Sequence, residues 1–312
     1  MRSGRILIVA VALATGVAAG FVAVADPVAV VVKLDGALQV QRAGGGDPVT
    51  GEVGMALSAG DRLLPAAGAR VVLLHSTGRT EVAAEPLTLA APEQGQRAGV
   101  FTRAVRTIES VAATSAKADP NRQGMIRPVP GTPVPVAPRN GIALLDTRPT
   151  FTWHSVPGAS AYMVQLRAAG ERPVRFDVGP DTVWTYPDSA TALRHGAIYQ
   201  WTVGAVGASA RVAESVGFRV LDSAAAGEIT SALAGLKAQG LEPEGDAPFL
   251  AAVLYHDAGL AYEADRLLAR LQATGAGEGR TFHLLRAEVY DALGKLDAAA
   301  REFALADAAA RE

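Results

Sequence analysis

The stretch that decides the fold of the middle of this 312-residue chain is RPTFTWHSVPGASAYMVQL, residues 148–166. Phe151 and Trp153 alternate with polar residues, and so do the apolar residues of 162–166. A period of two is typical of β-strands with one buried face. The Pro-Gly pair at 157–158 supplies turn chemistry between them. We therefore predict two strands joined by a turn, with their aromatic rings in a core.

A second stretch, LRHGAIYQWTVGAV (193–206), places Leu193, Gly196 and Tyr199 ahead of an alternating strand. In a two-sheet sandwich this is the pattern of a tyrosine corner, whose hydroxyl bonds backbone a few residues upstream. With the closing strand SVGFRVL, the segment resembles a fibronectin type III-like domain, which we place at residues 141–222. His195 stands where that family usually has proline.

The alternative for this domain is a ligand-binding aromatic platform. Such a platform requires exposed rings that are out of phase with the inward alternation. Trp184, in TVWTYP, is the one candidate for an exposed aromatic. Burying each of the other rings contributes roughly 1.5–3 kcal/mol, which favours the core interpretation.

Residues 28–92 consist of short alternating runs broken by Gly, Asp and Pro, which indicates a small all-β domain. VVKLDGALQVQR, GMALSAGDRLL and AGARVVLLHSTGRTEVA resemble the FecR-type periplasmic domain. In its Gly-x-x-Leu-x-x-Gly-Asp turn, here Gly54 to Asp61, Gly60 would take the positive-φ position and Asp61 would bond the next backbone amides. The anti-sigma activity of some members is not transferred, because only five residues precede the apolar run at 6–24.

The first 25 residues have the features of an export signal. Arg2 and Arg5 precede the apolar run, which ends in Ala-Val-Ala before Asp26. A retained membrane anchor is the alternative, since about 20 apolar residues can span a bilayer. Either way we expect an exported protein of the periplasm or cell envelope. The chain has no Cys, so its folding cannot depend on disulfides.

Two segments connect the β-regions. Residues 96–116 place apolar residues with helical periodicity, which predicts an amphipathic helix. We expect this helix to pack on the preceding β-domain, with partner binding as the alternative. Residues 117–140 are rich in Pro and are predicted to form an extended, semi-rigid linker.

Residues 224–312 contain an internal repeat. A shift of 35 residues superposes Leu250 on Leu285, Tyr255 on Tyr290 and Gly259 on Gly294. YHDAGLAYEADRLLARL and YDALGKLDAAAREFALA resemble tetratricopeptide repeats, although Ala251 and Arg286 stand where that family prefers Leu. A helix near 225–239 is expected to cap the stack. The predicted fold class is thus multidomain: two all-β domains followed by an all-α helical-repeat domain.

Repeats of this class form a concave groove from the first helix of each pair, which is where partners bind. By helical phase the candidate groove residues are Phe249, Val253, His256, Leu284, Glu288 and Asp291. The alternative is that two repeats make too shallow a groove and simply pack on the sandwich.

The sequence contains no pattern typical of an active site. The five His are scattered, and neither a phosphate-binding loop nor a nucleophile turn is present. We therefore expect no enzyme activity, no metal site and no cofactor. A net charge of −2 argues against nucleic-acid binding. The predicted function is a binding scaffold or signal relay for envelope protein partners. The alternative is a peptidoglycan- or polysaccharide-binding module, and membrane contact is expected only if the N-terminal segment is an anchor.

Overall fold

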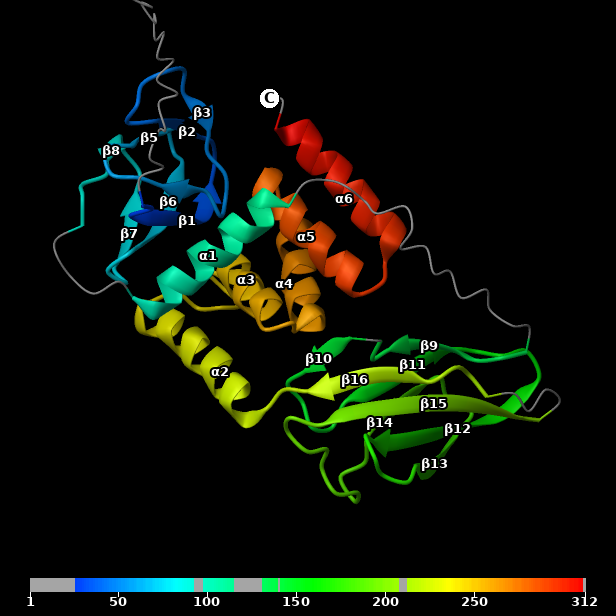
Figure 1. Ribbon diagram of the computed structural model, residues 1–312. Coiled ribbons are helices and arrows are strands. Elements are labelled where there is room, and N and C mark those ends of the chain that lie inside the picture. The colour runs from blue at the N-terminus through cyan, green and yellow to red at the C-terminus, as the bar shows by residue number, and fades with distance from the viewer. Residues whose placement is uncertain (1–25, 93–97, 115–130, 140, 208–211, 311–312) are drawn as a thin grey trace, which may run out of the picture.

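A computed structural model describes residues 26–92, 98–114, 131–139, 141–207 and 212–310 of the chain. It has an N-terminal β-domain, a β-sandwich and a set of helices that lies between them in space (Figure 1). The predicted fold class, β-sheet regions followed by a C-terminal helical region, is confirmed. The predicted export signal at 1–25 lies outside the described residues.

Two four-stranded sheets make up the β-domain, in the orders β4-β1-β6-β7 and β3-β2-β5-β8. Their strands are β1 (Ala29–Asp35), β2 (Leu38–Gln41), β3 (Val49–Thr50), β4 (Ala56–Leu57), β5 (Arg62–Pro65), β6 (Arg70–His75), β7 (Thr80–Ala83) and β8 (Leu87–Thr88). The apolar run of β1 is continuous because both of its faces are buried. Val31 faces the core within the domain, whereas Val30 and Val32 face the helices.

The glycine-aspartate turn of this domain differs in one detail from the prediction. Gly60 has a φ of +84°, as expected. Asp61, however, accepts hydrogen bonds from the amides of Ser58 and Ala43, both at 3.0 Å, and from Arg42 at 2.8 Å. Its carboxylate thus holds the preceding turn and a neighbouring loop, rather than the amides that follow it.

The sandwich pairs a five-stranded sheet, β10-β16-β15-β12-β13, with a three-stranded sheet, β14-β11-β9. The strands are β9 (Val134–Ala137), β10 (Ile142–Leu144), β11 (Thr150–His154), β12 (Ala159–Ala168), β13 (Val174–Gly179), β14 (Val183–Thr185), β15 (Ile198–Gly207) and β16 (Val216–Val220). The sandwich begins before the expected residue 141, because the end of the Pro-rich segment forms β9. Pro135 fits there, since β9 is an edge strand and needs no donor on its free side.

The aromatic residues of the opening stretch form the core of the sandwich. Trp153 and Tyr162 are buried and meet edge to face, with ring centroids 5.5 Å apart. Trp201 is fully buried, and its Nε1 donates to the carbonyl of Pro138 at 2.9 Å. The Tyr199 hydroxyl accepts from the amide of Arg194, five residues upstream, at 2.8 Å. The predicted tyrosine corner is therefore present.

The described helices are α1 (Gly99–Ala113), α2 (Ser223–Ala238), α3 (Pro248–Asp257), α4 (Ala261–Ala273), α5 (Arg280–Ala292) and α6 (Leu296–Ala309). Helices α3–α4 and α5–α6 form two hairpins, and α2 packs beside α3 as the predicted cap. The 35-residue repeat is reproduced at their turns. Gly259 and Gly294 have φ of +75° and +67°, and the amides of Leu260 and Lys295 bond the carbonyls of Tyr255 and Tyr290. Both turns are Schellman motifs.

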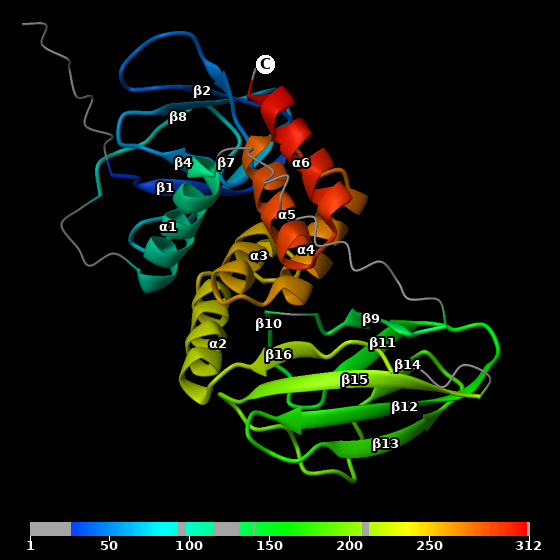
Figure 2. The same cartoon turned by 45° about the vertical axis from the view of Figure 1, so that its right-hand side comes forward.

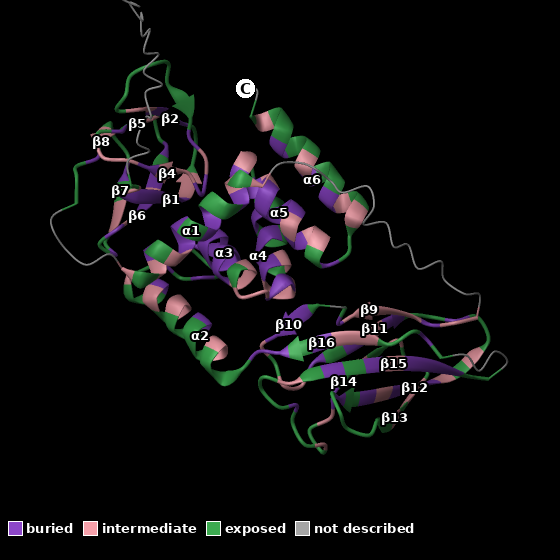
Figure 3. Cartoon of the chain, viewed as in Figure 1, coloured by how far each residue is buried: buried purple, intermediate pink, exposed green. Residues whose placement is uncertain are grey.

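The three parts of the molecule share one apolar core. Buried residues of β1 and β6, of α1, of the hairpins and of the sandwich belong to a single contiguous cluster. Figure 2 shows the β-domain and the sandwich at opposite ends of the helices. Buried residues are concentrated where α1, α3, α4 and α5 meet (Figure 3).

Candidate functional site

The residues predicted to line the groove lie on α3 and α5, the first helices of the two hairpins. Helix α1 of the same chain covers the surface that they form. Helix α1 packs against α3 and α5, the first helices of the two hairpins (Figures 1 and 2). The groove residues Phe249, Val253 and Leu284 are at most 1% exposed. The expectation that α1 packs chiefly on the β-domain therefore needs correction, since its main contacts are with the helices.

The apolar face of α1 supplies the packing against the groove. Its buried residues are Phe101, Ala104, Val105, Thr107, Ile108 and Val111. All except Thr107 belong to the same apolar cluster as the groove residues. Val100 and Ala112, which also fit the helical periodicity of 96–116, are only partly buried. They lie at the margins of the stripe.

Asp257, at the end of α3, binds α1 through polar contacts. Its Oδ1 accepts from the Thr107 hydroxyl at 3.0 Å, and its Oδ2 accepts from Arg103 Nε at 2.5 Å. Arg103 and Thr107 are four residues apart and therefore lie on one side of α1. Helical phase did not place Asp257 in the groove. Thr107 gave only a weak signal for it, because its hydroxyl also bonds the carbonyl of Arg103 in its own helix, at 3.0 Å.

Glu288, on α5, binds the C-terminal end of α1. One carboxylate oxygen accepts a short hydrogen bond from the Thr114 hydroxyl, and the other lies 2.8 Å from His256 Nε2. Burial acts to raise the pKa of Glu288, but the hydrogen bonds from His256 and Thr114 outweigh it and hold this pKa below its usual value. His256 and Glu288, both predicted groove residues, are thus brought together under α1. Asp291, the sixth, is half-buried one turn further on, and its carbonyl accepts from Gly294.

The turn between β3 and β4 of the β-domain closes the end of the groove. A Cβ on Gly54 would lie 2.5 Å from Cε1 of Phe249, so this turn contacts the groove directly. Glu52 caps α5: its carboxylate accepts from the amide of Arg280 at 2.5 Å and from the amide and hydroxyl of Thr281 at 3.1 and 2.6 Å. Sequence reasoning did not find these contacts, because they join segments far apart in the chain, 228 residues in the case of Glu52 and Arg280.

Trp184, the candidate exposed aromatic, is not an open platform. Its ring is partly buried and packs against Phe176 and Phe151, with centroids 4.9 and 5.4 Å away. Tyr186 completes this cluster at 6.0 Å. The ring therefore belongs to the margin of the sandwich core.

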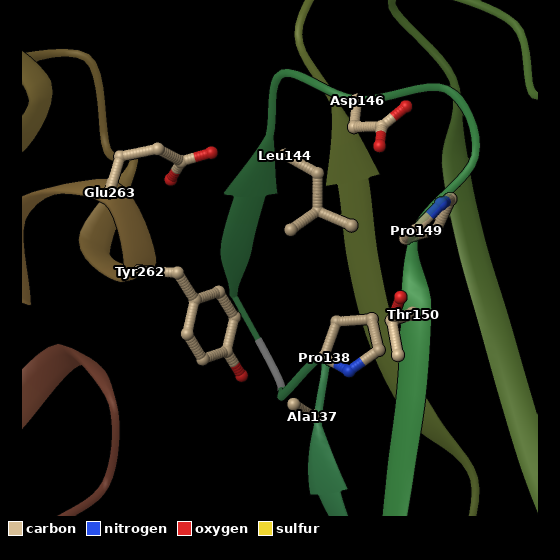
Figure 4. Close-up of a pocket in the computed structure, with 8 residues that line it drawn as sticks. All are labelled: Ala137, Pro138, Leu144, Asp146, Pro149, Thr150, Tyr262 and Glu263. Carbon is tan, nitrogen blue, oxygen red and sulfur yellow. The ribbon is translucent and has the colours of Figure 1, made fainter. Parts of the chain in front are cut away.

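A cavity of about 230 Å³ lies between the sandwich and α4. Figure 4 shows Tyr262 and Glu263 of α4 facing Pro138 and Leu144 of the sandwich. Burial raises the pKa of Tyr262 to about 12 and raises that of Glu263. The cavity therefore favours the neutral forms of both groups. Among the described residues no cluster of three or more His, Cys, Asp or Glu could hold a metal ion.

No helix within the described ranges is long and apolar enough to cross a membrane. No protein-family model matches the chain, and no curated protein matches its sequence.

Three solved structures show distant similarity. The FN1–FN3 domains of chicken CNTN1 are 12% identical, with 64% of this chain and 62% of that chain covered and a TM-score of 0.24. Astrotactin-2, a vertebrate-specific, perforin-like membrane protein, is 15% identical, with 53% and 34% covered and a TM-score of 0.19. A Ca²⁺-stabilized adhesin with which an Antarctic bacterium binds ice is 13% identical, with 61% and 41% covered and a TM-score of 0.17.

The chain spans less than two thirds of each of these proteins. These TM-scores are too low to support an argument about the fold. The sandwich is therefore assigned from the strand order and the tyrosine corner of this chain. In chain order, the protein thus has a β-domain, a fibronectin type III-like sandwich and a helical-repeat region. No family is assigned to the whole chain.

Proposed function

We propose that this protein is an exported, non-catalytic envelope protein that binds protein partners through the groove of its helical hairpins. The observation that carries the proposal is the docking of α1 in that groove, with a buried apolar stripe and with Asp257 and Glu288 as polar anchors. A surface that binds an amphipathic helix of its own chain has the shape and chemistry to bind such a helix from a partner.

The resemblances found in the sequence support the same proposal. Residues 28–92 resemble periplasmic FecR-type domains, and the hairpins resemble tetratricopeptide repeats, which bind partners in their groove. The predicted export signal supports an envelope location.

The covalent link to α1 sets a condition on any partner. Because α1 is tethered beside the groove, its effective concentration there is high, and a free helix must overcome this advantage. We therefore propose that a partner helix binds when the anchors of α1 are weakened. The partner would carry an apolar stripe that contains one hydroxyl and is flanked by a basic side chain, like Thr107 and Arg103 of α1.

A peptide of residues 98–114, labelled with a fluorophore, tests this proposal. The double variant Arg103→Ala, Thr107→Ala removes both hydrogen bonds to Asp257 and leaves its longer ion pair with Arg106, at 4.0 Å. Hydrogen bonds to a charged group are worth about 1.5–3 kcal/mol each. We expect fluorescence anisotropy to show that the peptide binds this variant with a dissociation constant about tenfold or more below that for the unmodified chain.

Thr102→Ala is the matched control. The exposed Thr102 hydroxyl donates to the carbonyl of Ala98, at the start of the same helix, at 3.4 Å, and its removal should leave peptide binding unchanged. Equal peptide binding by the double variant and the unmodified chain would contradict the proposal. Glu288→Arg is unsuitable as a test of partner binding alone, since it also removes the Thr114 anchor of α1.

A further inference from the structure

Strand β13 is a long, open edge of the five-stranded sheet. It pairs with β12 on one side and ends the sheet order on the other. Its six residues make it the longest edge strand among the described sheets, whose other edge strands have four residues or fewer. Figures 1 and 2 both show it on the side of the sandwich away from the helices. Its outer N–H and C=O groups can therefore pair with another strand.

The sequence of β13 is symmetric in chemical character about its centre. Val174 and Val178 lie two residues to either side of Phe176, and the oppositely charged Arg175 and Asp177 lie one residue to either side. Val174 is 56% exposed, and the side chains of Arg175 and Asp177 are 60% and 79% exposed. Arg175 and Asp177 are two residues apart, so they share one face of the strand, where their side chains lie 3.2 Å apart.

We propose that β13 pairs antiparallel with β13 of a second copy of this chain, about a twofold axis through Phe176. In that register Arg175 lies opposite Asp177 of the other copy, and the same pair occurs again across the axis. The exposed Val174 lies opposite the β-bulge at Val178 of the other copy, so the regular pairing is limited to Arg175–Asp177. Opposite charges directly across two strands are stabilising.

The charges of β13 differ from those that protect an edge strand. Protective charges of one sign repel a second copy in any register. Here a positive and a negative charge are placed so that the antiparallel register makes them complementary. A pairing shifted by two residues would lose this match, so the charges also select the register.

The flanking prolines limit the length of the paired segment. Pro173 and Pro180 bound the strand, and a proline supplies no amide for a ladder. The contact is isologous, since each copy offers the same strand, and it uses up the free edge of β13 in both. The two five-stranded sheets become one sheet across the dimer, with the two sets of helices on its distant sides. This inference does not depend on the proposed groove function.

Sedimentation velocity of the full chain over a roughly hundredfold range of concentration tests the proposal. We expect a reversible monomer–dimer equilibrium. Arg175→Asp and Asp177→Arg each place like charges opposite one another at both pairs, so each variant alone should dimerise about tenfold or more weakly. A chain that stays monomeric over the whole range, or that forms larger assemblies, would overturn the proposal.

Charge exchange provides the matched control. Mixing Arg175→Asp with Asp177→Arg restores opposite charges across the axis, so the mixture should form a heterodimer although neither variant dimerises well alone. The double variant Arg175→Asp, Asp177→Arg in one chain should dimerise like the unmodified protein. Single variants that fold but dimerise as the unmodified chain does would place the interface elsewhere and refute the pairing of β13.

Discussion

Arg286 is the residue at which the second hairpin departs from the expected repeat pattern, and its surroundings explain the departure. It is buried between α5 and α6, where its Nη1 lies 3.3 Å from Glu302 Oε1, and both side chains are 8% exposed. Its guanidinium also donates to the Tyr290 hydroxyl at 3.0 Å, and Glu302 lies 2.7 Å from His283 Nδ1. An ion pair and its hydrogen bonds thus stand where the resemblance to tetratricopeptide repeats predicts leucine packing.

Removing one member of this pair should be far more costly than replacing both. Glu302→Ala leaves a buried guanidinium without its counter-charge, which typically costs about 3–5 kcal/mol. The double variant Arg286→Leu, Glu302→Leu should lose much less, because no charge stays buried. Urea unfolding of both variants at equal m-value measures the difference. Equal losses in the two variants would show that the pair is not coupled.

At the scale of an element, the docking of α1 depends on one carboxylate whose ionisation can be followed. The pKa of Glu288 is held below its usual value by His256 and Thr114, in spite of burial. For a carboxyl group whose folded pKa is depressed, the stabilisation is complete above the unfolded pKa. It is lost as pH falls through the folded pKa.

We therefore predict that α1 loosens on acidification. Amide hydrogen exchange in residues 99–113, corrected for intrinsic rates, should show lower protection as pH falls below the usual range of glutamate ionisation. Glu288→Gln should show weaker protection at neutral pH and a flatter dependence on pH. A pH dependence of α1 protection that is unchanged in Glu288→Gln would assign the effect to another group.

At the scale of the whole molecule, Gly54 joins the β-domain to the helical groove. Its φ is +85°, and a Cβ there would overlap the Phe249 ring. Gly45 has a similar φ of +80°, but no described atom lies within 4 Å of the position of its Cβ. Both glycines have a positive φ, but only Gly54 also contacts another part of the molecule.

Gly54→Ala and Gly45→Ala together separate the two effects. Gly45→Ala should cost about 1–2 kcal/mol, from the left-handed backbone alone. Gly54→Ala should cost that amount and roughly 1–3 kcal/mol more, because the methyl group overpacks against Phe249. Thermal unfolding measures both. Equal losses of stability in the two variants would mean that the turn shifts to accept the methyl group without disturbing the groove.

Local sequence patterns predicted most of the secondary structure and turns. They did not predict how elements distant in the chain pack against one another. The tyrosine corner at Tyr199 and the glycine turns at 259 and 294 follow from residues within one motif, so the sequence was sufficient. The stripe of α1 identified a helix with a buried face, but an apolar stripe fits many apolar surfaces. That Thr107 meets Asp257, 150 residues away, depends on the packing of separate elements, which one sequence does not encode locally.

The position of α1 in the chain has a consequence for the order of folding. It is synthesised long before α3 and α5, and Thr114 precedes its anchor Glu288 by 174 residues. Until those helices emerge, its apolar face has no native cover, and closing so long a loop is slow. The β-domain and the sandwich can assemble from neighbouring strands, whereas the docking of α1 requires α3 and α5. A nascent chain that stops before α5 therefore exposes this stripe, which marks it as incomplete to chaperones and proteases.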